Sequence, residues 1–419
     1  MNIHYIRQLL LIFLIANFIT TYSQTNTFQD KFSKSFDFII VPKTTIHFKE
    51  FYEITIRQSI DHSNPKKKFD QRIYIGFQDF NAPNVIATEG YAIDYASKPD
   101  YSNELSTELK ANLIVIEHRF FGKSIPDSLD WNVLTVKQTA EDYHFIKTML
   151  DTILKGKWIS TGISKGGQAA LSYKMYYAKD VAATVVYGAA VKNKQTVTSD
   201  TLLFNLSQTS CGKKLSELQY FLFKHKNILL PYFSEYTSQK KYDFKPLDNE
   251  SLFDYLLLEL PFSFWQNGND CEIIPDTTAT IDNLLSYLIK IVPPGFFTGV
   301  NKIRLEPAFY MFYHELGYYE YDIKPFKKYL KQKDYSNSYF APQGVPIQFD
   351  NTYQKTLSEF IKNNSNIFFI YGQNDPWALQ TIWKENIFIV KAGSHKSRIA
   401  DLKAEQRINI FTKIKACIN

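Results

Sequence analysis

The chain has 419 residues, of which 45% are hydrophobic and 21% are charged. This length and composition exclude a wholly disordered chain, and they leave room for an α/β core that carries a large insertion. The formal net charge of +6 is spread over 48 basic residues without a long basic block, so nucleic-acid binding is not expected.

The first residues have the features of an export signal. Arg7 precedes an apolar stretch from Leu9 to Ile19, and small or polar residues follow it up to Ser23. This order is typical of a secretory signal peptide, and the apolar stretch is short for a membrane span. We expect residues 1–23 to be removed and the mature protein to be secreted or periplasmic without a stable membrane anchor. An N-terminal anchor helix is the alternative.

Apolar periodicity predicts the first half of a sheet. Short alternating runs between Phe51 and Phe80 indicate antiparallel strands at a sheet edge. Apolar runs then predict buried strands, and helical patterns lie between them. The strands are expected at 84–90, 112–119, 157–162 and 181–190, and the helices at 104–110, 142–154 and 164–180. Alternation of strand and helix is the signature of a mostly parallel sheet flanked by helices, the α/β class.

The alternation stops near Val197 and returns late in the chain. From Thr201 to about Phe340 the sequence is helical, aromatic and rich in loops. Apolar strands return at 366–371 and 386–390, and Ile399–Ile418 reads as a charged amphipathic helix. We therefore expect a core in two parts, 24–200 and 345–419, with a mainly helical cap inserted at 201–344.

A candidate nucleophile lies between a strand and a helix, in the motif Gly162-Ile163-Ser164-Lys165-Gly166. Small neighbours let such a sharp turn close and keep the serine hydroxyl exposed, as in the α/β-hydrolase fold. The helix that follows directs its free amides at the site, so the Lys165 amide is a candidate oxyanion donor. The alternative is a plain glycine-rich turn.

The loop Thr88–Tyr91 follows an early buried strand. In this fold such a loop lends a second oxyanion amide, here from Gly90 or Tyr91. A simple turn is the alternative.

A candidate acid and a candidate base follow the late strands in the order that this fold requires. Asp375 lies in YGQNDPWA, and His395, the one histidine after it, lies in IVKAGSH. We expect His395 to take the proton of Ser164 and Asp375 to fix the imidazole tautomer. An ordinary Asn-Asp turn and a surface histidine are the alternatives.

Three cysteines are present, Cys211, Cys271 and Cys417. In an exported protein one disulfide is plausible, and Cys211 with Cys271 is the preferred pair because both lie in the same middle region. Their spacing fits no metal site, and the expected chemistry needs no cofactor.

The charged trio Glu117-His118-Arg119 follows a buried strand. We interpret it as a hydrogen-bonded structural network, with a substrate-facing role as the alternative.

Four motifs together resemble a known family. EHRFFGKS, TGISKGG, YGQNDPWA and the terminal GSH resemble the secreted prolyl tri- and tetrapeptidyl aminopeptidases, which are serine peptidases related to prolylcarboxypeptidase and dipeptidyl peptidase II. The resemblance extends from Phe51 to about Lys415. It implies a capped α/β-hydrolase that releases short peptides from free N-termini, often after proline.

Position by position, the resemblance implies Ser164 as nucleophile, Asp375 as acid and His395 as base. It also places Glu315 near the cleft. An exopeptidase must hold the substrate ammonium, so Glu315 and Glu89 are the candidate carboxylates.

Two other functions stay open at this stage. One is an esterase or acylhydrolase on the same core, and the other is a catalytically silent peptide-binding protein. The presence of all three catalytic residue types argues against the silent protein.

Overall fold

The computed structural model describes residues 27–191, 196–197, 201–378 and 386–418. The predicted signal peptide, residues 1–23, lies outside the described residues. Within those ranges, none of the helices combines the length and the apolar character needed to span a bilayer.

In the described residues, nine strands form one sheet in the order β1-β2-β3-β5-β4-β6-β7-β10-β11. Pairings along β1, β2, β3 and β5 are antiparallel, and all the others are parallel. The strands are β1 (Ile39–Pro42), β2 (Glu50–Ser59), β3 (Lys68–Phe77), β4 (Asn84–Thr88), β5 (Asn112–Ile116), β6 (Trp158–Ile163), β7 (Ala183–Tyr187), β10 (Ile367–Gly372) and β11 (Ile387–Val390). This mostly parallel sheet with an exchanged β5-β4 pair confirms the predicted α/β-hydrolase fold.

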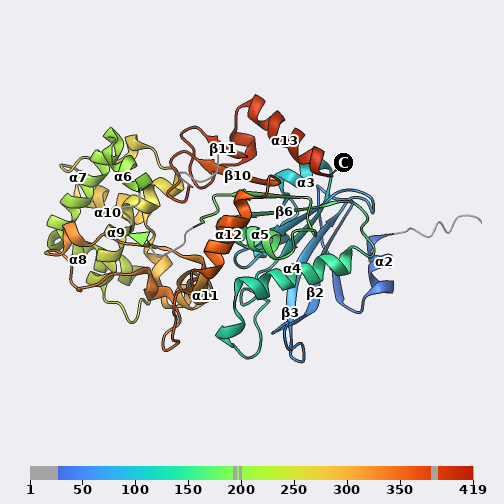
Figure 1. Cartoon of the computed structure of the whole chain (residues 1–419). Coiled ribbons are helices and arrows are strands. Elements are labelled where there is room, and N and C mark those ends of the chain that lie inside the picture. Colours follow the sequence, from blue (N-terminus) through green and yellow to red (C-terminus); the bar gives the residue numbers. More distant parts are fainter. Residues whose placement is uncertain (1–26, 192–195, 198–200, 379–385, 419) are drawn as a thin grey trace, which may run out of the picture.

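Helices cover both faces of the sheet (Figure 1). One face packs against α4 (Val136–Leu150), α5 (Lys165–Tyr176) and α12 (Thr352–Lys362), and the other against α3 (Glu104–Leu109) and α13 (Ala404–Ile418). The central strands are apolar on both sides, because alternate side chains point to opposite helical layers.

A group of helices lies beside the sheet, between β7 and β10 in the chain (Figure 1). They are α6 (Thr201–Gln208), α7 (Ser210–Lys224), α8 (Lys226–Gln239), α9 (Asn249–Asn267), α10 (Ile281–Ile291) and α11 (Gly299–Met311). A disulfide joins Cys211 in α7 to Cys271, 60 residues later, as the preferred pairing expected. Cys417 is a free thiol.

Some elements differ from the expected ones. Helix α4 begins at Val136, six residues before the predicted start of 142, because the Thr135 hydroxyl accepts a hydrogen bond from the Gln138 amide and caps the helix. Helix α2 (Phe28–Ser35) was not predicted; its buried Phe28 and Phe32 pack against the β2–β3 edge.

Four further elements were not predicted. They are β1, helix α12 and the short parallel pair of β8 (Thr196–Val197) with β9 (Tyr319–Glu320). Two of these strands are only two residues long, which is too short for periodicity to reveal.

Candidate active site

The predicted site residues gather at one edge of the sheet. Parallel strands present their carboxyl ends at a common edge, where this class of fold binds ligands. The loops after β4, β6, β7, β10 and β11 carry Thr88–Tyr91, Ser164, Gly188, Asp375 and His395 respectively. Residues from distant parts of the chain therefore meet in one place.

Ser164 occupies a strained turn between β6 and α5. Its φ of 55° and ψ of −122° lie outside the regions that L-residues ordinarily adopt. Small neighbours make the turn possible: a Cβ on Gly162 would lie 2.2 Å from the Gly166 carbonyl oxygen. The Ser164 amide donates to the Tyr187 carbonyl of β7 at 2.8 Å, which fixes the turn against the sheet.

The amide of Lys165 is the first in helix α5 and has no intrahelical acceptor. The loop Thr88–Tyr91 approaches the same helix start, since a Cβ on Gly90 would lie 2.8 Å from the Gly166 nitrogen. The Thr88 hydroxyl lies 2.9 Å from the Gly166 carbonyl oxygen and 3.0 Å from that of Thr161. The loop and the turn are thus fixed to each other, which suits a pair of amides aimed at one oxyanion.

Asp375 and His395 are hydrogen-bonded. The imidazole Nδ1 lies 2.9 Å from Asp375 Oδ2. The carboxylate is fully buried, and its Oδ1 accepts a hydrogen bond from the Trp377 amide at 3.0 Å. A buried acceptor at Nδ1 holds the proton there and leaves Nε2 as the basic nitrogen.

Two residues that support this pair were not predicted. Gly188, in the loop after β7, lies against the His395 ring and adopts a φ of 56°. Gln266 lies at the end of α9. Its backbone carbonyl oxygen accepts a hydrogen bond from the His395 amide at 3.2 Å, and its side-chain oxygen accepts one from the Trp377 indole N–H at 2.9 Å. The glycine after the strand VVY was a sequence signal for Gly188, whereas no local pattern marks Gln266.

A cavity of about 400 Å³ opens above Ser164. Aromatic side chains make up much of its wall, contributed by Tyr91, Phe121, Phe309, Phe312, Tyr318 and Trp377. Several of these come from α11 and the segment after it, so the inserted helices close the cavity over the strand ends. A largely apolar pocket with few polar groups is the usual form of a site for organic ligands.

Lys165 contributes its side chain as well as its amide to this region. The residue is 2% exposed, and among the described residues its Nζ has no hydrogen-bond partner. Burial therefore lowers the pKa of the Lys165 ammonium well below its ordinary value. Arg304 is the second cationic residue in the cavity wall and lies exposed on α11.

The two carboxylates predicted to anchor a substrate ammonium do not line the cavity. Glu315 Oε2 accepts a hydrogen bond from the Val136 amide at 2.9 Å, so this carboxylate stabilises the N-terminus of α4. Glu89 lies beside Tyr95, and burial raises the pKa of Glu89 to about 7 against the opposing effects of Tyr95 and Arg398. The structure thus places Glu315 at the start of α4, and its predicted substrate-binding role stays a prediction.

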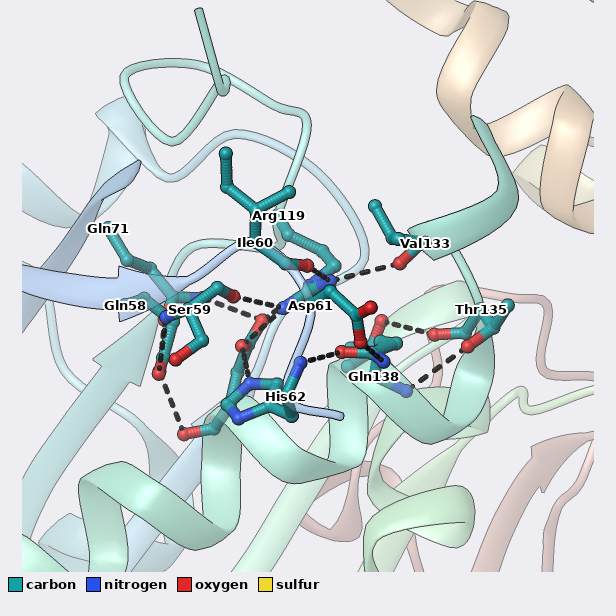
Figure 2. Close-up of polar contacts among 12 residues, drawn as sticks. Gln58, Ser59, Ile60, Asp61, His62, Gln71, Arg119, Val133, Thr135 and Gln138 are labelled. Carbon is teal, nitrogen blue, oxygen red and sulfur yellow. Dashed lines mark hydrogen bonds and ion pairs between the residues drawn. The ribbon is translucent and has the colours of Figure 1, made fainter. Parts of the chain in front are cut away.

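The trio Glu117-His118-Arg119 forms the structural network that the sequence predicted. Figure 2 shows Arg119 at the meeting point of the turn after β2 and the start of α4. Its guanidinium donates to both Asp142 oxygens at 2.7 Å and to the backbone carbonyls of Ser59, Ile60 and Val133. All five of its N–H groups therefore donate to acceptors within the protein, and none is left to bind a substrate.

The Glu117 carboxylate connects strand β3 to the segments around Ile93 and Lys123. Its carboxylate accepts from the Arg72 guanidinium, from the Ser124 hydroxyl at 2.8 Å and from the amides of Ile93 and Lys123. The fully buried carboxylate is thus paired and hydrogen-bonded on both oxygens, as a buried charge requires.

Comparison with known proteins shows the family of the chain. The family model described as PS-10 peptidase S37 matches residues 34–414. The chain belongs to the peptidase S37 family. It is a serine peptidase of the α/β-hydrolase fold.

Individual relatives of this peptidase S37 chain are distant. It is 28% identical over 377 residues to the prolyl tri/tetrapeptidyl aminopeptidase of Streptomyces mobaraensis. The aligned residues make up 86% of this chain and 78% of that protein. It is also 28% identical to human lysosomal Pro-X carboxypeptidase over 161 residues, or 34% of this chain and 32% of that protein. Among solved structures, an α/β hydrolase from Novosphingobium aromaticivorans matches 87% of this chain and 98% of its own at 12% identity, with a TM-score of 0.40.

Proposed function

We propose that this serine peptidase is an exported exopeptidase that releases short peptides from free N-termini through an acyl-enzyme. The observation that carries the proposal is the buried Asp375–His395 pair at the same sheet edge as Ser164, which lies on its strained turn. Similarity to a prolyl tri/tetrapeptidyl aminopeptidase over most of the chain supports release of peptides of that length. The aromatic cavity wall offers flat apolar surfaces against which a proline ring can pack.

The chemistry follows from the roles of these residues. The Ser164 hydroxyl attacks the scissile carbonyl carbon while its proton passes to His395 Nε2, and Asp375 stabilises the imidazolium. The Lys165 amide and one of the Gly90 and Tyr91 amides stabilise the oxyanion. The C–N bond then breaks, and His395 returns the proton to the leaving amine. Water repeats the sequence on the ester, which frees the short peptide and restores Ser164.

Export is proposed on two features of the chain. The first is the order of Arg7, the apolar stretch Leu9–Ile19 and the small residues that follow. The second is the Cys211–Cys271 disulfide, which suits an oxidising compartment. Recovery of the protein outside the cytoplasm, with an N-terminus near residue 24, is the expected result of cell fractionation and N-terminal sequencing.

The activity is tested with an Ala-Ala-Pro p-nitroanilide, offered with a free or an acetylated N-terminus to the wild-type protein and to Ser164→Ala. Cleavage of the free form only, lost in the variant, is the expected result. Equal cleavage of the acetylated form would contradict aminopeptidase specificity. Hydrolysis of a simple ester alone would favour an esterase, and inactivity on every substrate would favour a silent peptide-binding protein.

A further inference from the structure

The described walls of the cavity above Ser164 hold two basic side chains without a matching carboxylate. Lys165 and Arg304 line it, and none of the described lining residues is acidic. The start of α5, with its unpaired amides, adds a partial positive charge at the same end. Opposite charges attract, so these groups favour a ligand anion in this part of the cavity.

The Lys165 ammonium is built into the wall rather than exposed at its rim. Nζ lies 5.8 Å from the ring centre of Tyr91 and 5.4 Å from that of Phe121, and both rings line the cavity. Aromatic faces stabilise a cation only in part, so an ammonium held there still lacks a hydrogen-bond acceptor.

The neighbouring titratable residue His118 does not supply the missing negative charge. His118 is fully buried, and its Nδ1 lies 2.7 Å from the Arg119 carbonyl oxygen, which can only accept. The Nδ1 proton is therefore fixed, and Nε2, which has no partner in the described part of the chain, is a neutral acceptor. Burial and the Lys165 charge lower the pKa of His118 well below its ordinary value.

We propose that Lys165, with Arg304 at the cavity mouth, forms a subsite for a carboxylate of the peptide substrate. The carboxylate is either an acidic side chain next to the scissile bond or the free C-terminus of a very short peptide. Burial without a partner disfavours the charged form of Lys165, and a ligand carboxylate stabilises the ammonium by forming an ion pair with it. The inference rests on the proposed peptidase function and defines its substrate class.

Binding to an inactive protein tests the subsite without depending on turnover. Three peptides are titrated calorimetrically into Ser164→Ala: Ala-Ala-Gln amide without a carboxylate, Ala-Ala-Glu amide with a side-chain carboxylate, and Ala-Ala-Gln with a free C-terminus. We expect at least one carboxylate peptide to bind at least tenfold more tightly than the uncharged one. The peptide that does so identifies the source of the carboxylate.

The same titrations in Ser164→Ala/Lys165→Met assign the effect to the ammonium. Methionine keeps the approximate length of the side chain and leaves the backbone amide in place. In this variant the carboxylate peptides and the uncharged peptide should bind with about equal affinity. Ser164→Ala/Lys147→Met is the matched control, because it removes the same charge from a lysine that does not line the cavity. Lys147 lies on α4 and pairs with Asp151. The preference of this control should equal that of Ser164→Ala.

Two outcomes would overturn the proposal. One is equal or weaker binding of both carboxylate peptides to Ser164→Ala, and the other is a preference that survives in Ser164→Ala/Lys165→Met. Failure of the proposed aminopeptidase activity is recognised separately, because the wild-type protein would then cleave no free-amine peptide while the binding preference persisted.

Discussion

Gly188 lies directly against the imidazole of His395. A Cβ built on Gly188 would lie 2.7 Å from both Cε1 and Nδ1 of the ring and 3.1 Å from Asp375 Oδ2. Its φ of 56° is also one that other residues rarely adopt. The glycine therefore leaves the space in which the acid–base pair forms, although it contributes no functional group.

Gly188→Ala should therefore damage catalysis more than folding. The added methyl group displaces the imidazole, and we expect kcat/KM for a peptide anilide to fall by at least about 100-fold, as small misplacements of catalytic groups do. Gly344→Ala is the matched control, because Gly344 has a φ of 74° but nothing within 4 Å of its Cβ position. Both variants should lose about 1 kcal/mol of unfolding free energy through backbone strain, and only the first should lose activity. Similar activity in the two variants would contradict the proposed contact.

Asp375→Asn tests the role of the buried carboxylate. The amide favours the wrong imidazole tautomer, and we expect kcat to fall by about 10⁴-fold with little change in KM. The exposed Asp70, which pairs with Arg57 on the surface, supplies the control Asp70→Asn, which should keep full activity. A loss below tenfold in Asp375→Asn would remove Asp375 from the proposed triad.

Arg119→Met tests the buried network of Figure 2. The buried Asp142 would lose its guanidinium partner and keep only the His62 imidazole, and we expect the unfolding free energy to fall by about 3 to 5 kcal/mol in denaturant titration. Arg57→Met removes an arginine from an exposed pair, whose two side chains are 59% and 52% exposed, and should cost less than about 1 kcal/mol. Comparable losses in the two variants would show that burial of the network contributes no extra stability.

The protonation of Glu89 should make the stability of the protein depend on pH. Burial raises the pKa of Glu89 from 4.5 to about 7, so the folded protein holds a proton that the unfolded chain has released. The contribution of this group to stability is complete below about pH 4.5 and declines as the pH rises to about 7. Glu89→Gln cannot ionise, so it should be more stable than the wild type at pH 8, by about 3 kcal/mol, and close to it near pH 4.5.

Denaturant titrations of both proteins at the two pH values measure this difference. Glu108→Gln is the control, since Glu108 is 48% exposed and pairs with Lys415 at the surface. It should shift stability equally at both pH values. A Glu89→Gln variant that is destabilised more at pH 8 than at pH 4.5 would show that the ionised carboxylate makes favourable contacts, contrary to the prediction.

Local patterns in the sequence determined most of the core. Strands β4, β5, β7 and β10 are nearly continuous apolar runs, because they are buried on both faces of the sheet. The turn around Ser164 was recognisable because its glycines are required by contacts within a few residues. The positions of Asp375 and His395 followed from chain order, which the fold fixes.

Only the tertiary structure decided which distant groups meet. The Glu315 carboxylate and the Val136 amide are 179 residues apart, and no local pattern marks their hydrogen bond. The same holds for Gln266, which binds the loops that carry Asp375 and His395, and for the placement of Lys165 Nζ between aromatic rings. Backbone periodicity and turn chemistry act over a few residues and are written into the sequence, whereas the partner of a buried polar group depends on how whole elements pack.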